Sequence, residues 1–130
     1  MTQREPAVFL RNVNLLVRDV DYARRFYEET LGLILDERRS ALPAMLILQT
    51  PGGCTLSLKD ATTEEPGKVT GPGDVELGFE TKALDEVHAA MTSFGVKVTA
   101  IVEQGFGRTF DGLDPDGHHL VVYTLRQENR

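Results

Sequence analysis

The sequence has little cysteine and no long hydrophobic run. Its one cysteine, Cys54, excludes an internal disulfide and a metal site built from cysteines alone. The apolar stretches are too short to span a membrane. The first ten residues, MTQREPAVFL, contain neither the apolar region nor the cleavage site of an export signal. We therefore expect a cytoplasmic protein with no membrane partner.

An excess of positive charge and a glycine-rich phosphate motif are also missing. Fourteen Lys and Arg stand against 20 Asp and Glu, which gives a net charge of −6. Nucleic-acid affinity depends largely on neutralising phosphates, so we expect no nucleic-acid partner. The hydrophobic content of 41% and charged content of 26% are ordinary for a globular protein. The length of 130 residues predicts a single domain, 1–130, large enough to bury a core.

The chain contains two copies of one pattern. The segment VNLLVRDVDYARRFYEETLGLIL (13–35) matches VELGFETKALDEVHAAMTSFGVKV (75–98), and PGGCTLSL (51–58) matches PDGHHLVV (115–122). Each copy reads as a strand, a helix and three strands. The sequence therefore predicts a first module over 10–60 and a second over 74–126, joined by a linker over 61–73 that is rich in Pro, Gly and Thr.

Local signals support an α+β fold with helices on one face of curved, mixed sheets. Asp19 and Thr81 are expected to cap the two helices at their starts, and Gly32 and Gly95 to end them in left-handed conformations. Apolar residues alternate along the strands, which indicates one buried face. The side chains expected to face the core are those of Val13, Leu15, Val17, Leu56, Leu58, Val75, Leu77, Phe79, Leu120 and Val122.

The opposite face of the sheets is predicted to form a half-polar cup, a common site for a small ligand. By alternation its lining comes from four strands, two in each module. The residues are Asn12, Asn14, Leu16, Thr55, Ser57, Lys59, Asp74, Glu76, Gly78, His119, Val121 and Tyr123.

The doubled βαβββ layout, with VRDVDYARRFYEETLGL (17–33) and DPDGHHLVVY (114–123), resembles the vicinal oxygen chelate superfamily. That superfamily includes glyoxalase I, extradiol dioxygenases, and fosfomycin- and bleomycin-resistance proteins. The resemblance covers roughly residues 10–125 and implies the fold. One scaffold of this kind hosts many chemistries, so the resemblance alone does not assign a function.

The superfamily's metal enzymes hold their ion at four positions of the cup. Carried onto this chain, the resemblance assigns these positions to Asn12, Ser57, Asp74 and Val121. Valine has no donor atom, Asn and Ser are weak neutral ligands, and only Asp74 could bind a divalent ion well. We therefore predict no metal and no cofactor.

Three residues are candidates for catalysis or for anchoring a cationic ligand. Asp74 and Glu76 could act as a pair of general bases or attract an amine, or they could form a solvated strand end. His119 could complete a shifted ligand set with them, or it could be a rim histidine that leaves a Pro-Asp-Gly turn. A nucleophilic pairing of Ser57 with His119 lacks both a nucleophile elbow and an orienting acid.

The segment EQGFGRTFDGL (103–113) is the other candidate for ligand contact. Phe106, Arg108 and Phe110 are predicted to form one wall of the cup, because the resemblance places this stretch there. A core position is an equal alternative for Phe110.

Two function classes follow. The first is a metal-independent small-molecule binding protein that sequesters a drug or metabolite, as the bleomycin-resistance members do. In it Asn14, Arg108 or Tyr123 would orient the ligand by hydrogen bonds. The second is a lyase, isomerase or dioxygenase-like enzyme acting on a small carbonyl or hydroxylated metabolite. A homodimer is expected, because members of the superfamily complete their cups by pairing modules within or between chains.

Overall fold

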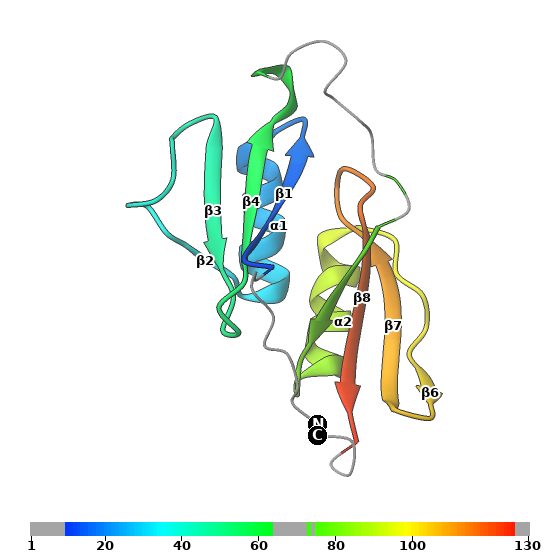
Figure 1. The fold of residues 1–130 in the computed structure, drawn as a ribbon. Helices are drawn as coiled ribbons and strands as arrows, with labels where there is room; N and C mark the ends of the chain where they lie inside the picture. The colour runs from blue at the N-terminus through cyan, green and yellow to red at the C-terminus, as the bar shows by residue number, and fades with distance from the viewer. Residues whose placement is uncertain (1–9, 64–72, 74, 127–130) are drawn as a thin grey trace, which may run out of the picture.

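The structure is a computed structural model and describes residues 10–63, 73 and 75–126 (Figure 1). The first module contains β1 (Asn12–Val17), α1 (Val20–Leu31), β2 (Ile34–Leu35), β3 (Met45–Gln49) and β4 (Thr55–Asp60), followed by a short 3₁₀ helix (Ala61–Thr63). The second module contains β5 (Glu76–Glu80), α2 (Leu84–Phe94), β6 (Val102–Gln104), β7 (Gly107–Leu113) and β8 (His119–Leu125). The predicted order of elements in each module is confirmed.

Each module forms its own four-stranded sheet. The strand orders are β1-β4-β3-β2 and β5-β8-β7-β6. The β1–β4 and β5–β8 pairs are parallel and the others antiparallel, so both sheets are mixed. The edge strands β1 and β5 lie on the sides of the sheets that are turned toward each other (Figure 1). Among the residues described, no strand pairing joins the two sheets into a barrel.

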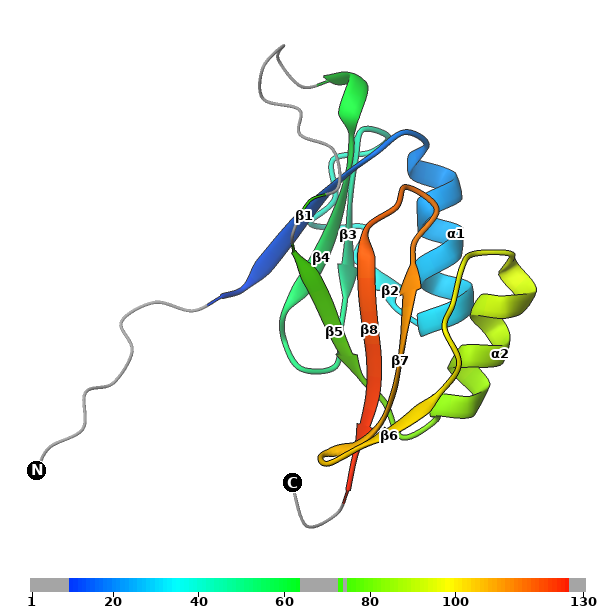
Figure 2. The ribbon, with the colours of Figure 1, turned by 90° about the vertical axis from the view of Figure 1, so that its right-hand side faces the viewer.

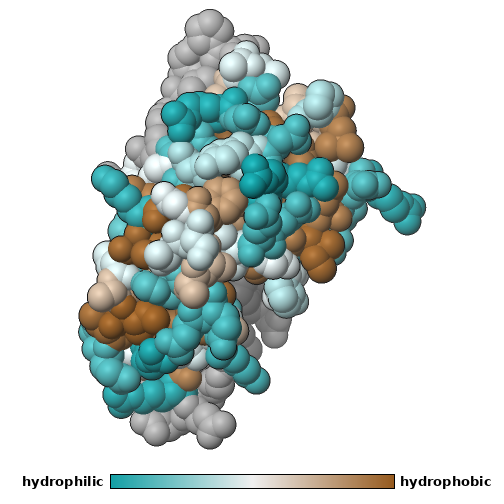
Figure 3. Space-filling model, turned by 180° about the vertical axis from the view of Figure 1, so that it is seen from behind, coloured by the Kyte–Doolittle hydropathy of each residue, from teal (hydrophilic) through white to brown (hydrophobic). Residues whose placement is uncertain are grey.

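Both helices cover the same side of the two sheets, which leaves the other face of each sheet open in the same direction (Figure 2). The helices also contact each other, since the Phe26 and Phe94 rings meet edge to face with centroids 5.4 Å apart. Most side chains predicted to face the helices are buried or packed against the core. From the helix side, hydrophilic side chains interrupt the hydrophobic patches (Figure 3). Over the described residues, neither helix is long and apolar enough to cross a membrane.

Three of the four predicted helix boundaries are confirmed. The Asp19 carboxylate accepts a hydrogen bond from the Tyr22 N–H at 3.0 Å, and Gly32 and Gly95 adopt left-handed φ angles of 70° and 100°. The prediction for Thr81 was wrong. The N-cap of α2 is Ala83, and the Thr81 hydroxyl accepts a hydrogen bond from the Ala83 N–H, outside the helix.

The buried position predicted for Val75 was also wrong. Val75 is 69% exposed because β5 begins only at Glu76, so Val75 precedes the strand.

A buried polar cluster joins the two modules. The Tyr27 hydroxyl, on α1, donates a hydrogen bond to Asp114 Oδ2 at 2.6 Å, and His118 Nδ1 lies 2.7 Å from the same oxygen. Asp114 Oδ1 accepts the backbone N–H groups of Asp116 and His118. At the end of β1, the Arg18 Nε lies 3.0 Å from Asp116 Oδ1. These contacts attach the β7–β8 turn of the second module to the first.

Candidate functional site

A hydrogen-bonded network occupies the open face of the first module. Asn12 Oδ1 accepts the hydroxyls of Thr55 at 2.6 Å and Ser57 at 2.8 Å, and Asn12 Nδ2 donates to Asn14 Oδ1 at 2.7 Å. Ser57 is 1% exposed. The amide oxygen of Asn12 therefore already accepts two hydrogen bonds, which is its usual capacity.

The open face of the second module places a histidine between two carboxylates. His119 Nε2 lies 3.2 Å from Asp111 Oδ2, and His119 Nδ1 lies 3.5 Å from Glu76 Oε2. The structure thus brings Glu76 and His119 together on the predicted face. Sequence reasoning missed Asp111, which stands opposite Val121 in the β7–β8 ladder. Asp74 lies outside the described residues.

The strand register identifies Glu76, and not Asp74, as the counterpart of Asn12. Asn12 begins β1 and Glu76 begins β5, each eight positions before its helix, which starts at Val20 or Leu84. Each also pairs with the first residue of the parallel strand, Asn12 with Thr55 and Glu76 with His119. The four symmetric positions are therefore Asn12, Ser57, Glu76 and Val121.

These four positions do not fit a metal ion. Asn12 Oδ1 is engaged by two hydroxyls, the Ser57 hydroxyl donates to it from a buried position, and Val121 has no donor atom. Glu76 alone offers a strong oxygen ligand, and divalent cations in proteins need several. In the described part of the chain, no group of three His, Cys, Asp or Glu side chains could hold a metal ion.

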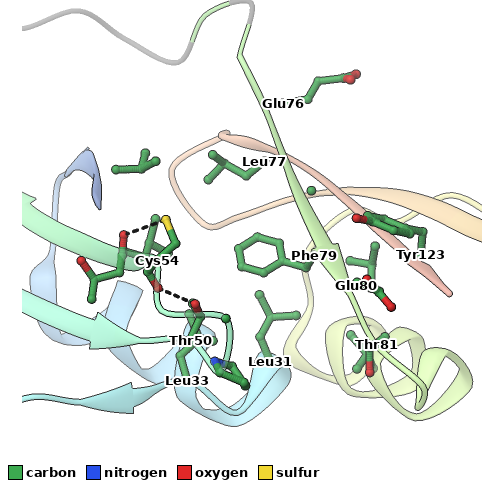
Figure 4. A pocket seen from close by; sticks show the side chains of 18 of the residues that line it. Leu31, Leu33, Thr50, Cys54, Glu76, Leu77, Phe79, Glu80, Thr81 and Tyr123 are labelled. Carbon is green, nitrogen blue, oxygen red and sulfur yellow. Dashed lines mark hydrogen bonds between the residues drawn. The ribbon is translucent and has the colours of Figure 1, made fainter. Parts of the chain in front are cut away.

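A crevice of about 670 Å³ separates the two modules along the edge strand β5 (Figure 4). The wall from the first module comes from β1, the end of α1, the loop before β4 and the start of β4, and includes Leu31, Leu33 and Cys54. The wall from the second module comes mainly from β5, the start of α2 and β8. It includes Leu77, Phe79 and Tyr123.

The crevice adjoins the open face of the second module. Glu76 and Tyr123 belong to that face by strand alternation and also line the crevice. Gly78 leaves space beside them. A Cβ added to Gly78 would meet only the Tyr123 ring, at 3.5 Å. The Phe106 ring stands edge-on to Tyr123, with centroids 6.1 Å apart, and is 41% exposed.

The structure does not place Arg108 and Phe110 beside Phe106. Phe110 is 1% exposed and contacts the His88 ring within the core, which was the alternative for this residue. Arg108 forms two hydrogen bonds with the Asp85 carboxylate, which lowers the pKa of Asp85. The cause is the register of β7: Phe110 pairs with the buried Val122, so Phe110 and Arg108 point to the helix side.

The buried cluster at the β7–β8 turn has perturbed electrostatics. Burial and the Asp114 charge raise the pKa of Tyr27 well above its ordinary value. Burial alone would raise the pKa of Asp114, but hydrogen bonds from His118 and Tyr27 outweigh it and lower that pKa. The hydrogen bond to Asp114 raises the pKa of His118, against the effect of burial. The cluster therefore stabilises the junction of the modules and stands apart from the residues that line the crevice.

Comparisons with known proteins agree with this architecture. The model of the Glyoxalase/Bleomycin resistance protein/Dioxygenase superfamily matches residues 10–122. Among solved structures, a glyoxalase-related enzyme from Fulvimarina pelagi is 22% identical with a TM-score of 0.74, over 89% of this chain and 87% of that chain. A glyoxalase/bleomycin resistance protein/dioxygenase family enzyme from Burkholderia phytofirmans PsJN is 19% identical with a TM-score of 0.79, over 92% and 100%.

A third similar structure is a lactoylglutathione lyase from Agrobacterium tumefaciens, 17% identical with a TM-score of 0.70, over 92% of this chain and 95% of that chain. At these identities the three structures show the fold alone. No curated protein matches the sequence.

Proposed function

Because the chain belongs to the glyoxalase/bleomycin resistance protein/dioxygenase superfamily, we propose that it is a small-molecule binding protein that holds its ligand in the crevice without a metal ion. The cytoplasm is the location we propose with it, since the single cysteine is free. Sequestration of a drug or metabolite is the biological role that this proposal implies.

The observation that carries the proposal is the crevice itself. Its volume of about 670 Å³ lies within the range of roughly 300–1,000 Å³ that is usual for small-molecule sites. Its walls are mostly apolar, with a few polar groups such as Glu76, Thr81 and Tyr123. Apolar walls supply affinity, and a small number of polar groups fix the orientation of a ligand.

The side chains that could act as metal ligands on the open faces support binding without a metal. Of the four symmetric positions, only Glu76 carries a strong ligand, and Asn12 and Ser57 satisfy each other by a hydrogen bond. A reaction that depends on an ion at these positions would lack the coordination it needs.

Occluding the crevice tests the proposal. We would titrate the protein in EDTA with the neutral fluorescent probe 6-propionyl-2-dimethylaminonaphthalene. In Gly78→Leu the new side chain would extend into the crevice, because little surrounds the position, and we expect affinity to fall by about tenfold or more. Ala89→Leu, on the exposed side of α2, adds similar bulk elsewhere and should bind as the wild type does. Unchanged binding by a folded Gly78→Leu variant would overturn the proposal.

We propose in addition that two copies of the chain pair through their open faces. Both faces are turned in one direction (Figure 2), so the faces of one chain cannot cover each other. The face of the first module carries partly exposed apolar side chains, among them Leu16, Met45 and Ile47. Ile34 at its edge is 65% exposed. Sedimentation equilibrium should give a dimer that Ile47→Glu dissociates; a monomer at every concentration would refute the pairing.

A second candidate function is supported by the position of His119 between Asp111 and Glu76. A histidine beside carboxylates can accept a proton from a carbon acid, as a lyase or isomerase acting on a small carbonyl compound requires. Exchange of the α-proton of such a compound in D₂O, lost in His119→Gln and retained in His88→Gln, would favour the enzyme over the passive binder.

A further inference from the structure

Charge is distributed unevenly over the walls of the crevice. Among the described residues that line it, the charged ones are Glu76 and Glu80, both on β5. Among the described residues that form the walls, none is a Lys, Arg or His. The described side chains in the wall from the first module are apolar or carry hydroxyls, besides the Cys54 thiol. The described side chains of the crevice thus carry formal charge of one sign.

The uncharged polar side chains in the walls are mostly acceptors as well. The Thr50 hydroxyl donates to the Cys54 carbonyl, and the Thr55 hydroxyl donates to Asn12 Oδ1. The Cys54 thiol points to the Thr55 carbonyl. Each of these three groups already donates its proton to a hydrogen bond within the wall, so it can only accept a hydrogen bond from a ligand. Donors remain at the Tyr123 and Thr81 hydroxyls.

The apolar part of the crevice lies directly beside these acceptors. Leu77 and Phe79 alternate with Glu76 and Glu80 along β5, and Figure 4 shows the Phe79 ring between the two walls. An aromatic or aliphatic body could therefore contact Phe79 and Leu31 while its polar head reaches the carboxylates at the rim.

We infer that the crevice selects organic cations: a ligand with an ammonium or guanidinium group, rich in hydrogen-bond donors, on an apolar body. The inference rests on the proposed function and names the ligand class for the same site. A cation gains affinity from both carboxylates and from the acceptor hydroxyls, whereas a carboxylate ligand meets like charge and finds few side-chain donors.

A matched series of probes tests the inference. The three probes share a naphthalene body and differ in the head group: 2-(1-naphthyl)ethylamine, 2-(1-naphthyl)ethanol and 3-(1-naphthyl)propanoate. We would measure affinity by calorimetry at pH 7 in EDTA, and locate each probe by its effect on the amide resonances of Gly78 and Thr81. We expect the amine to bind about tenfold more tightly than the alcohol, and the carboxylate to bind least.

Two carboxylate variants provide the matched control. The Glu76→Gln/Glu80→Gln double variant keeps the shape of the rim and removes its charge, so the preference for the amine should disappear. The Glu86→Gln/Glu103→Gln variant removes the same net charge at exposed positions outside the crevice and should keep that preference. Raising the salt concentration should weaken the amine alone, because exposed charges are screened.

The outcomes separate this inference from the proposed function. If the alcohol or carboxylate binds in the crevice as tightly as the amine, the ligand class is wrong while binding in the crevice stands. A preference for the amine that survives in the Glu76→Gln/Glu80→Gln variant would also overturn the proposed ligand class. If none of the probes perturbs Gly78 or Thr81, the crevice is not a binding site, and both the function and the class fail.

Discussion

The Tyr27 hydroxyl and the Asp114 carboxylate, 87 positions apart in the chain, form a fully buried hydrogen bond of 2.6 Å. Tyr27 is on α1 of the first module, and Asp114 opens the β7–β8 turn of the second. This contact, together with Arg18 on Asp116, attaches one module to the other. The relative position of the modules, and with it the width of the crevice, depends on contacts of this kind.

We predict that Tyr27→Phe destabilises the protein by about 1–3 kcal/mol, because it leaves a buried carboxylate with one partner fewer. Tyr22→Phe is the matched control, since Tyr22 is 44% exposed and its loss of a hydroxyl should change stability by less than about 0.5 kcal/mol. Urea denaturation followed by circular dichroism measures both. Equal stabilities of the two variants would show that the bond to Asp114 does not hold the modules together.

The Asp114–His118 pair predicts a pH dependence of stability. The pKa of His118 is raised in the folded protein, so the stability it contributes is fully present below the unfolded value of about 6.5. That contribution is lost as pH rises through the folded pKa. The pKa of Asp114 is lowered, so its contribution is present above about 3.9 and is lost as pH falls through the folded pKa.

An NMR titration of the His118 ring measures this prediction directly. We expect its midpoint above the ordinary histidine value of about 6.5. In Asp114→Asn the midpoint should fall, because the carboxylate that favours the charged ring is gone. A midpoint at or below 6.5 in the wild type would mean that burial outweighs the hydrogen bond.

The side chains at the four symmetric positions predict weak metal binding. Calorimetric titration of the protein with zinc, nickel or manganese should show no tight, stoichiometric uptake, since Asn12, Ser57 and Val121 supply no strong ligand. Stoichiometric uptake that disappears in Glu76→Ala or Asp74→Ala would contradict the proposal of metal-independent binding and would favour the enzyme.

Much of the fold could be predicted from the sequence because its signals are local. Alternation in Val13, Leu15 and Val17 gave β1 its buried face, and Asp19 and Gly32 bounded α1 through their own side-chain and backbone preferences. These signals need no knowledge of the rest of the chain.

The register of the second module was less certain because the two helices differ in length by one residue, 12 against 11. Matching VNLLV with VELGF pairs Val13 with Val75 and assigns the symmetric position to Asp74, although Val75 stands one position farther from Gly95 than Val13 does from Gly32. Counting from the starts of the helices gives Glu76 instead, as the strand pairing does.

The positions of Arg108 and Phe110 depend on pairing with β8, and a shift of one residue in such a ladder reverses every side chain. The crevice depends on how the modules dock through Tyr27 and Asp114, and no local pattern encodes such a long-range contact. These parts of the site could therefore not be predicted from sequence alone.

Cys54 gives the most direct test of the central claim, that a ligand occupies the crevice without a metal. It is the only cysteine of the chain and its side chain lines the crevice, so alkylation by iodoacetamide reports on this hollow alone. In EDTA, saturation with 2-(1-naphthyl)ethylamine should slow the alkylation of Cys54 by about tenfold or more, and the alkylated protein should no longer bind the probe. An unchanged alkylation rate while the probe is bound would place the ligand elsewhere and contradict the account.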